Sequence, residues 1–196
     1  LRSAEEIGRG AGARAVSRLG SRKMETAQVP IVYDPRVSGG LVRHLAEAIN
    51  GVAIARETSF LKDSMDQRVF APGIAIIDDP HRLRGLRSKP FDAEGIANAR
   101  RTLIEDGVLK SWILDLASSR KLGVETTGNA ARGTTSPPSP GSTNLYMEPS
   151  DTSPAELMAD IDSGFYVTEL IGMGINQITG DYSRGATGFW IENGGI

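Results

Sequence analysis

The last nine residues of the chain, Gly188-Phe-Trp-Ile-Glu-Asn-Gly-Gly-Ile196, predict a β-hairpin. An apolar, aromatic run favours a strand. Asn193-Gly194 directly after it is the strongest short signal for a tight turn, because both central residues of a type I′ turn need a positive φ angle. The returning strand would begin at Gly195, where the chain stops. We therefore expect these 196 residues, which begin with Leu1 rather than Met, to be part of a longer protein.

The same turn chemistry recurs in the middle of the chain, where Asp106-Gly107 separates strands predicted at 101–105 and 108–112. Apolar runs predict further strands at 29–33, 73–77, 144–148 and 165–171. Capping residues and helical spacing predict helices at 3–19, 38–50, 114–122 and 153–162. We predict an α+β fold that is mainly antiparallel, rich in strands with a few helices, and incomplete at both ends.

The helix predicted at 38–50 is amphipathic. Four apolar side chains share one face, namely Leu41, Val42, Leu45 and Ile49. His44 lies at the flank of the polar face with Glu47 three residues on, and we interpret it as a surface histidine.

Residues 126–143 are rich in Thr, Ser, Gly and Pro, and they predict a long loop that is too polar to pack. Loops longer than ~12–15 residues inside a domain are usually functional or mobile. We therefore treat this loop as a candidate functional segment.

Composition excludes several classes of function. The 22 Lys and Arg against 24 Asp and Glu give a net charge of −2, which argues against direct nucleic-acid binding and against a polybasic membrane surface. No apolar run approaches the ~18 residues of a membrane-spanning helix. The chain has no Cys, which excludes disulfides and thiolate sites and fits a cytoplasmic location.

Few residues offer metal or nucleophilic chemistry. His81 follows Asp78-Asp79, a pattern that can form one corner of a metal site, but a solvated turn is the favoured interpretation. Ser183 has no nearby His to activate it as a nucleophile. We interpret Asp181 and Arg184 as a structural charged pair in a turn.

Gly172-Met-Gly174 is interpreted as a strand bulge or a tight turn, because it lacks the third Gly and the helix of a phosphate-binding loop. The aromatic residues of the predicted strands are expected to pack in the core: Trp112, Phe165, Tyr166, Phe189 and Trp190. The residues alone therefore specify an α+β domain and no particular enzyme.

Several stretches nevertheless resemble one family closely. They are Gly39-Gly-Leu-Val-Arg-His-Leu-Ala-Glu-Ala-Ile49, Thr58-Ser-Phe-Leu-Lys-Asp-Ser64, Pro90-Phe-Asp-Ala-Glu-Gly95, Ser119-Arg-Lys-Leu-Gly123 with Thr127-Gly-Asn129, Val167-Thr-Glu-Leu-Ile-Gly-Met-Gly174 and Gly180-Asp-Tyr-Ser-Arg-Gly-Ala-Thr-Gly-Phe-Trp-Ile-Glu-Asn-Gly194. Together they resemble the TldD/PmbA family, and specifically its PmbA (TldE) branch.

The resemblance implies a subunit of a cytoplasmic zinc metalloprotease that hydrolyses peptides as a heterodimer. In the family, the TldD-type subunit carries zinc through His-Glu-x-x-x-His on a helix, and the PmbA type is its partner. Some members are named modulators of DNA gyrase. By this resemblance, residues 1–22 are a helix and linker from the end of an N-terminal domain, and residues 23–196 are a C-terminal PmbA-type domain truncated after 196.

The sequence departs from the catalytic pattern on the helix at 38–50. His44 matches the first His, but Leu45 stands at the Glu position and Ile49 at the second His. A lone imidazole is far from the three protein ligands of a catalytic zinc site, and Leu45 cannot activate a water. We therefore expect no metal and no catalytic residue in this chain, with zinc in a TldD-type partner.

The expected role is to bind substrate and close a peptide-degrading chamber. The loop 126–143 and the segment 172–188 are candidates for lining it, and Asn129, Asp181 and Arg184 are candidate substrate contacts. Two alternatives stay open. One is an autonomous hydrolase, working as a homodimer, with ligands among His44, His81, Asp78 and Asp79. The other is a non-enzymatic regulator that binds DNA gyrase.

Overall fold

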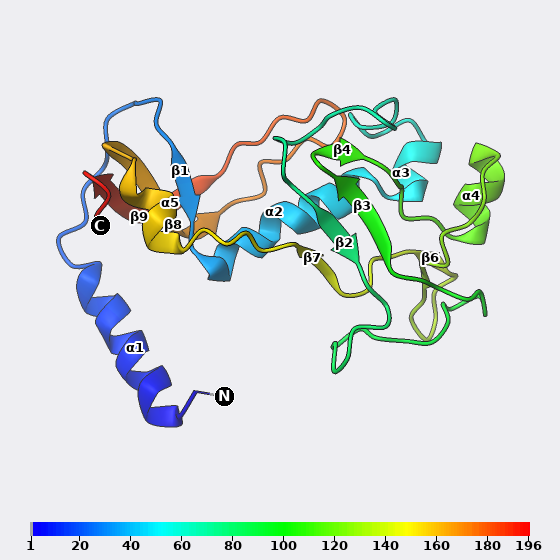
Figure 1. Cartoon of the computed structure of the whole chain (residues 1–196), viewed down its shortest axis with the longest axis horizontal. Helices are drawn as coiled ribbons and strands as arrows, with labels where there is room; N and C mark the ends of the chain where they lie inside the picture. Colours follow the sequence, from blue (N-terminus) through cyan, green and yellow to red (C-terminus); the bar gives the residue numbers. More distant parts are fainter. Residues whose placement is uncertain (1) are drawn as a thin grey trace.

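The computed structural model describes residues 2–196, and its strands form two small sheets and a two-stranded ribbon (Figure 1). The first sheet has the order β1 (Ile31–Tyr33), β8 (Ser163–Ile171), β9 (Gly185–Glu192). The second has the order β4 (Val108–Leu109), β3 (Arg101–Glu105), β2 (Ile76–Asp78), β7 (Leu145–Met147). The ribbon joins β5 (Ala130–Ala131) to β6 (Ser139–Pro140). Only the β1–β8 pair of these is parallel, so the predicted α+β, mainly antiparallel fold is confirmed.

Five helices accompany the strands in residues 2–196: α1 (Ala4–Ser17), α2 (Pro35–Ala48), α3 (Gly51–Ala55), α4 (Leu116–Leu122) and α5 (Pro154–Ala159). Capping boxes begin α1 at Ser3 and α5 at Ser153, as the sequence predicts. α2 begins before the predicted residue 38, because Asp34 caps it and Pro35 opens it.

The two predicted tight turns are present. Asp106 and Gly107 have φ angles of 46° and 78°, and Asn193 and Gly194 have 49° and 79°. These are the left-handed values that a type I′ turn requires. After the second turn, the amide of Glu192 donates to the carbonyl of Gly195 at 2.9 Å.

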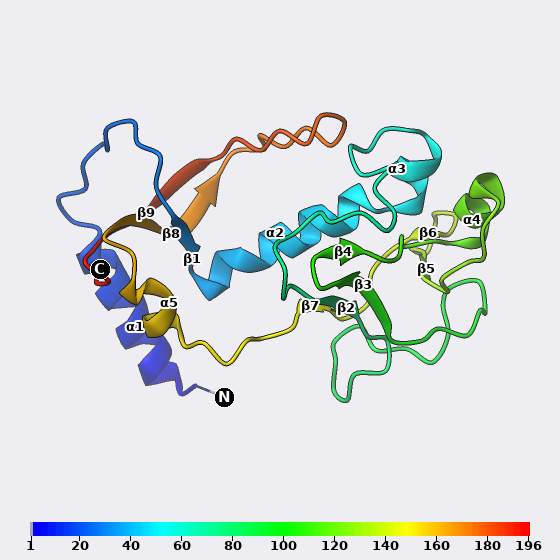
Figure 2. The same ribbon diagram turned by 45° about the horizontal axis from the view of Figure 1, so that its top comes forward.

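α2 is the centre of the molecule. Its inner face packs on the four-stranded sheet, and its axis runs from the first sheet toward α3 (Figures 1 and 2). The core around it consists of Leu45, Ala48, Ile49, Leu61, Ile76, Leu103, Ile104, Leu109 and Ile113. Burying each of the larger side chains stabilises the fold by about 1.5–3 kcal/mol, so this cluster fixes the orientation of α2.

The expectation that residues 126–143 do not pack is wrong for both ends of this loop. The buried carboxylate of Asp78 accepts hydrogen bonds from Thr143 N at 2.6 Å, Thr143 Oγ1 at 2.8 Å and Asn129 Nδ2 at 2.7 Å. Asp92 accepts a further bond from Ala130 N at 3.0 Å. Buried carboxylates therefore hold the polar residues of the loop in place, and the exposed part of the loop is its middle, 132–137, together with Ser139.

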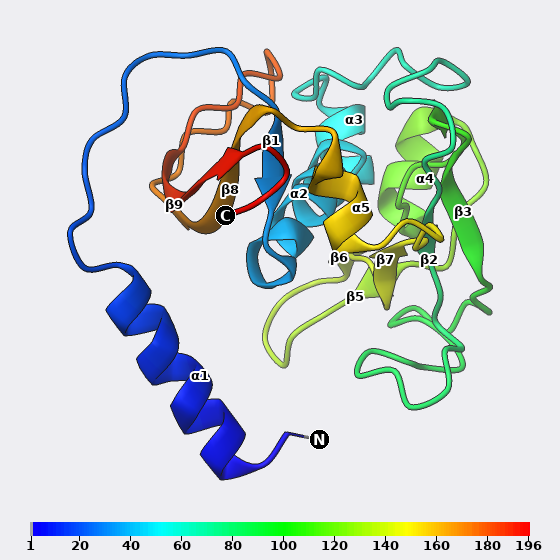
Figure 3. The same cartoon turned by 60° about the vertical axis from the view of Figure 1, so that its left-hand side comes forward.

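The β8–β9 hairpin continues beyond its sheet as a long twisted ribbon that runs beside α2 toward α3 (Figure 2). α1 lies at the other extreme. It has no buried residue, and the irregular segment 18–30 joins it to β1 (Figure 3).

Candidate functional site

The outer face of α2 carries His44, opposite the core. The side chain of His44 is only 15% exposed, because the ring of Tyr182 lies edge-on to it with centroids 6.1 Å apart. Its Nδ1 atom lies 3.3 Å from Glu47 Oε2. His44 is therefore part-exposed and lines the surface cleft described below, but it is more covered than the sequence suggests because a segment more than 100 residues away lies over it.

That covering segment is 172–184, which connects β8 to β9. Gln177 Nε2 donates to Glu47 Oε2 at 3.4 Å, and Phe60 N donates to the carbonyl of Gln177 at 2.9 Å. Burial raises the pKa of Tyr33, and the neighbouring Tyr182 adds to this shift. The segment 172–184 therefore covers the polar face of α2, with Gln177 on Glu47 and Tyr182 on His44.

Of the two structures predicted for the Gly-x-Gly at 172–174, a strand bulge or a tight turn, the structure has the bulge: between the pairs Ile171–Gly185 and Ile175–Tyr182 this side of the ribbon has one more residue than the other. Gly172 has a φ angle of 84°, and a Cβ on Gly174 would collide with the carbonyl of Ser183. Ser183 N donates to the carbonyl of Gly174 at 2.7 Å. Glycine at 174 is what lets the two sides of the ribbon approach this closely.

The predicted ion pair between Asp181 and Arg184 is not formed. Asp181 instead accepts from Thr179 Oγ1 at 2.6 Å, and Arg184 Nε donates to the carbonyl of Ile171 at 3.4 Å. Among the ion pairs of residues 2–196, none includes Arg184. Asp181 bonds within the turn, whereas Arg184 bonds to β8, so their closeness in sequence did not predict their contacts.

A cleft of about 380 Å³ lies between the first half of α2, the end of β8 and Arg184. It is lined by Arg36, Val37, Gly39, Gly40, Arg43, His44, Glu169, Leu170 and Arg184. It therefore brings together two residues singled out in the sequence, His44 and Arg184. Sequence analysis missed Arg36 and Arg43, although their spacing of seven places them on one face of a helix.

Asp34 holds Arg36, one of the residues that line this cleft. Its carboxylate caps α2 through Arg36 N at 2.9 Å, pairs with Arg36 Nε and Nη2 at 2.8 and 2.9 Å, and accepts from Tyr166 Oη at 3.2 Å. The side-chain hydrogen bond from Arg36 is the main cause that lowers the pKa of Asp34 to about 2, against an opposing effect of burial. One carboxylate thus joins the start of α2 to β8.

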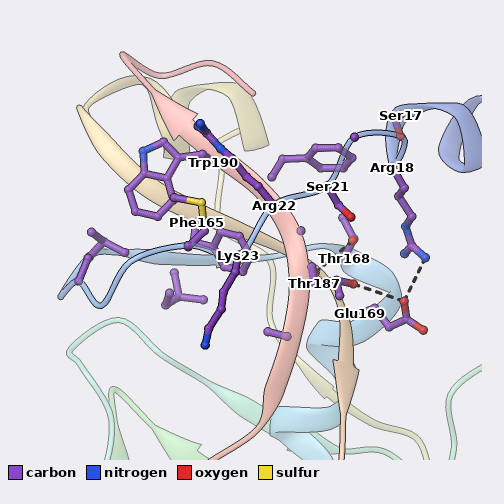
Figure 4. Close-up of a pocket in the computed structure, with 18 of the residues that line it drawn as sticks. Ser17, Arg18, Ser21, Arg22, Lys23, Phe165, Thr168, Glu169, Thr187 and Trp190 are labelled. Atoms are coloured by element: carbon purple, nitrogen blue, oxygen red, sulfur yellow. Dashed lines mark hydrogen bonds and ion pairs between the residues drawn. The ribbon is translucent and has the colours of Figure 1, made fainter.

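A larger groove of about 880 Å³ lies between the segment 17–29 and one face of β8 and β9 (Figure 4). Phe165 and Trp190 line it with ring centroids 6.3 Å apart, and Arg18 pairs with Glu169 at 3.0 Å. Phe165, Tyr166, Phe189 and Trp190 are only half-buried. The expectation that they pack in the core is therefore wrong, whereas Trp112 does pack against it.

The residues of the alternative metal site lie in separate environments. Asp78 is buried and holds the loop described above, and Asn129 donates to it and is itself only 5% exposed. His81 Nε2 lies 2.9 Å from Asn98 Oδ1, and Asp79 accepts from the backbone of His81 at 2.9 Å. Within residues 2–196, no three side chains of His, Asp or Glu are grouped so that they could hold a metal ion.

The donor set on α2 does not fit zinc either. Leu45 and Ile49, which stand at the metal-helix positions, are 6% and 0% exposed and belong to the core cluster. His44 points away from them, under Tyr182. A catalytic zinc site needs about three nitrogen, oxygen or sulfur ligands, and here an apolar Ile49 stands at the position of the second His ligand while Leu45 stands at the position of the general-base Glu.

Fold and site together define the class of protein: an α+β domain in which a central amphipathic helix, with one imidazole and an arginine-lined cleft, joins two small sheets. Residues 26–196 match the family described as the PmbA/TldA metallopeptidase C-terminal domain. The chain belongs to this PmbA/TldD family, as the resemblance in its sequence indicated.

Relatives support this membership. Metalloprotease PmbA of Escherichia coli O157:H7 is 40% identical over 196 residues, which cover 100% of this chain and 42% of the relative. A metalloprotease of Methanothermobacter thermautotrophicus is 32% identical over 194 residues, covering 98% of this chain and 42% of the relative. The chain therefore spans less than half the length of these relatives.

Solved structures agree with the fold. A proposed modulator of a DNA gyrase from Thermotoga maritima matches with a TM-score of 0.85 at 34% identity, covering 100% of this chain and 45% of that one. TldE from Thermococcus kodakarensis matches with a TM-score of 0.77 at 26% identity, covering 95% and 44%. None of the helices within residues 2–196 has the length and apolar content needed to cross a bilayer.

Proposed function

We propose that this chain is the C-terminal part of a PmbA/TldE-type subunit of a cytoplasmic metalloprotease, whose zinc is carried by a TldD-type partner. The observation that carries the proposal is the burial of Leu45 and Ile49 in the core, at 6% and 0% exposure. A subunit built in this way has one imidazole on α2, His44, and no complete set of zinc ligands there, so it would act on peptides through its partner. Family membership supplies the reaction class, peptide-bond hydrolysis.

The subunit's own contribution is substrate binding. An extended peptide can add to an open sheet edge through main-chain hydrogen bonds. In the order β1-β8-β9 we propose the edge of β1 for this, because the edge of β9 faces the chain that returns after the Asn193-Gly194 turn. Asp181 and Arg184 lie in the segment that leads into β9, and we propose that 172–188 lines the chamber together with 126–143. Asn129 serves this role only indirectly, because its amide already holds the loop to Asp78.

The test is the zinc content of the full-length protein, purified alone without chelator, together with peptide hydrolysis before and after a TldD-type subunit is added. We expect less than roughly one zinc per ten chains, and hydrolysis only in the mixture. About one zinc per chain with hydrolysis by the protein alone would overturn the proposal. His44→Ala and His81→Ala variants would then test the autonomous, homodimeric hydrolase.

The second candidate, a non-enzymatic regulator of DNA gyrase, is favoured by the names of two structural neighbours, from Bacteroides thetaiotaomicron and Thermotoga maritima. With a net charge of −2, the chain would act on gyrase protein rather than on DNA. Co-purification of full-length protein with gyrase at physiological salt, in the absence of any TldD-type subunit, would support this candidate over the first.

A further inference from the structure

Positive charge is concentrated in the cleft beside α2. Three guanidinium groups line it, those of Arg36, Arg43 and Arg184, and the only acidic side chain in its lining is Glu169. The whole chain is slightly acidic, with a net charge of −2, so this local excess of cations does not follow from composition. A cleft whose lining carries more positive than negative side chains attracts anionic ligands.

The arginines differ in how much of their charge is already paired. Arg36 is engaged in two hydrogen bonds by Asp34, and Arg43 is 3.7 Å from Glu47. Glu169 is paired with Arg18 at 3.0 Å, outside the cleft lining. Within residues 2–196, Arg184 has no carboxylate partner, and its Nε is held by the carbonyl of Ile171. The Nη atoms of Arg184 are therefore the donors most available to a ligand.

The walls of the cleft suit a small anion. Gly39 and Gly40 lie on its helical side, where an added Cβ would meet no atom within 4 Å, so the space above the backbone is open. Val37 and Leu170 add apolar surface beside the guanidinium groups. A volume of about 380 Å³ holds a carboxylate and one adjoining side chain, and it is too small for a folded partner.

We propose that this cleft binds the C-terminal carboxylate of an extended peptide, with Arg184 as the main donor and Arg43 as the second. The planar fork of arginine matches a carboxylate with two parallel hydrogen bonds, and the apolar wall accommodates the last side chain of the peptide. The identity of the ligand as a peptide rests on the proposed function. The recognition itself, of an oxyanion by arginine, rests on the cleft alone.

The experiment measures the binding of two labelled hexapeptides to the full-length protein without a TldD-type subunit. The peptides are identical except that one ends in a free carboxylate and the other in an amide. We expect the carboxylate peptide to bind about tenfold more tightly, in line with a charge-assisted hydrogen bond. Arg184→Ala should abolish this preference without weakening the amide peptide, and Arg184→Lys should keep only part of it.

Two control variants separate binding from folding. Gly40→Leu fills the cleft but favours the helix, because Leu has the higher helix propensity, so its Tm should not fall while the carboxylate preference disappears. Arg120→Ala removes an exposed arginine from α4, outside the cleft, and should leave the preference unchanged.

Equal binding of the two peptides to the wild type would overturn the proposal. Displacement of the peptide by inorganic phosphate at far lower concentration than by acetate would show a phosphate site and would also overturn it. A carboxylate preference that persists, combined with absent peptide hydrolysis after a TldD-type subunit is added, would leave the site in place and reject the proposed function. Peptide hydrolysis in the mixture, without any preference for the carboxylate peptide, would support the proposed function and reject the carboxylate site.

Discussion

At the scale of single residues, the carboxylate of Asp34 connects three parts of the fold. It caps α2, pairs with Arg36 and accepts a hydrogen bond from Tyr166, which lies 132 positions further along the chain. Its capping role could be predicted from the Asp-Pro sequence, but the bond from Tyr166 could not, because nothing local in the sequence reports which strand lies beside β1. The same holds for Arg184, whose partner is a carbonyl of β8 rather than the nearby Asp181.

The stability contributed by Asp34 should depend on pH. The pKa of Asp34 in the folded protein is about 2, below the value of about 4 in an unfolded chain. The folded state therefore stabilises the ionised carboxylate relative to the protonated carboxyl group. This contribution is present above about pH 4 and is lost as the pH falls toward 2. Asn is as good an N-cap as Asp, so Asp34→Asn removes mainly the charge-assisted hydrogen bonds from Arg36, and we expect it to lower the free energy of unfolding by ~1–2 kcal/mol at pH 7. The difference from wild type should shrink between pH 4 and 2 in urea titrations. The same difference at both ends of this range would contradict the prediction, and Asp151→Asn, on an exposed residue, is the control.

Asp78 should be the costliest single carboxylate to remove. Its three hydrogen bonds come from Thr143 and Asn129, and the side chain is 2% exposed. Asp78→Ala leaves these buried donors without an acceptor, which should destabilise the protein by ~3–5 kcal/mol in urea unfolding. Glu125→Ala, at an exposed position, should change stability by less than ~0.5 kcal/mol. A loss below ~1 kcal/mol for Asp78→Ala would show that water replaces the missing carboxylate.

At the scale of elements, the local signals predicted well. The capping boxes at Ser3 and Ser153, and both type I′ turns, are present where the sequence places them, because each depends on residues within one turn of chain. The packing of 126–143 was not predictable in the same way. Its polar residues are satisfied by Asp78 and Asp92, and those contacts join positions 38 to 65 residues apart.

Two glycines should respond to alanine with opposite signs. Gly107 has a φ of 78°, and a Cβ there would meet the carbonyl oxygens of Phe70 and Ala71, so Gly107→Ala should cost ~2 kcal/mol or more. Gly39 lies within α2 with open space around it, so Gly39→Ala should stabilise the protein by up to ~1 kcal/mol. Thermal unfolding of both variants checks this pair. A gain in Tm for Gly107→Ala would mean that the hairpin tolerates a different turn.

At the scale of the whole molecule, the sequence predicted the fold class but not how its parts cover one another. The segment 172–184 lies over α2 and leaves His44 only 15% exposed, and the half-buried aromatic residues of β8 and β9 line a groove instead of a core. Both differences arise because the position of a long hairpin relative to a helix is set by tertiary packing, which periodicity does not report.

The segment 18–30 should be the first part of the chain to be cut by trypsin. It has neither helix nor strand, and all its side chains except Val29 are exposed. Cleavage needs local unfolding, which costs little here and much in a paired strand. Mass spectrometry of a time course should show cuts after Arg22 or Lys23 well before any cut after Arg101 in β3. Simultaneous cleavage at these sites would indicate that the sheet opens as readily as the linker.

The parallel pairing of β1 with β8 has a kinetic consequence. Tyr33 pairs with Val167, so this sheet closes a loop that contains the whole four-stranded sheet, α2, α3 and α4. Contacts between residues so far apart in sequence form slowly, because the closure entropy of the intervening chain opposes them until that chain is compact. During synthesis, β1 leaves the ribosome long before its neighbour exists. We therefore expect the middle of the chain to become compact first. β1 would stay unpaired until residues 163–171 have been synthesised and can form β8 beside it.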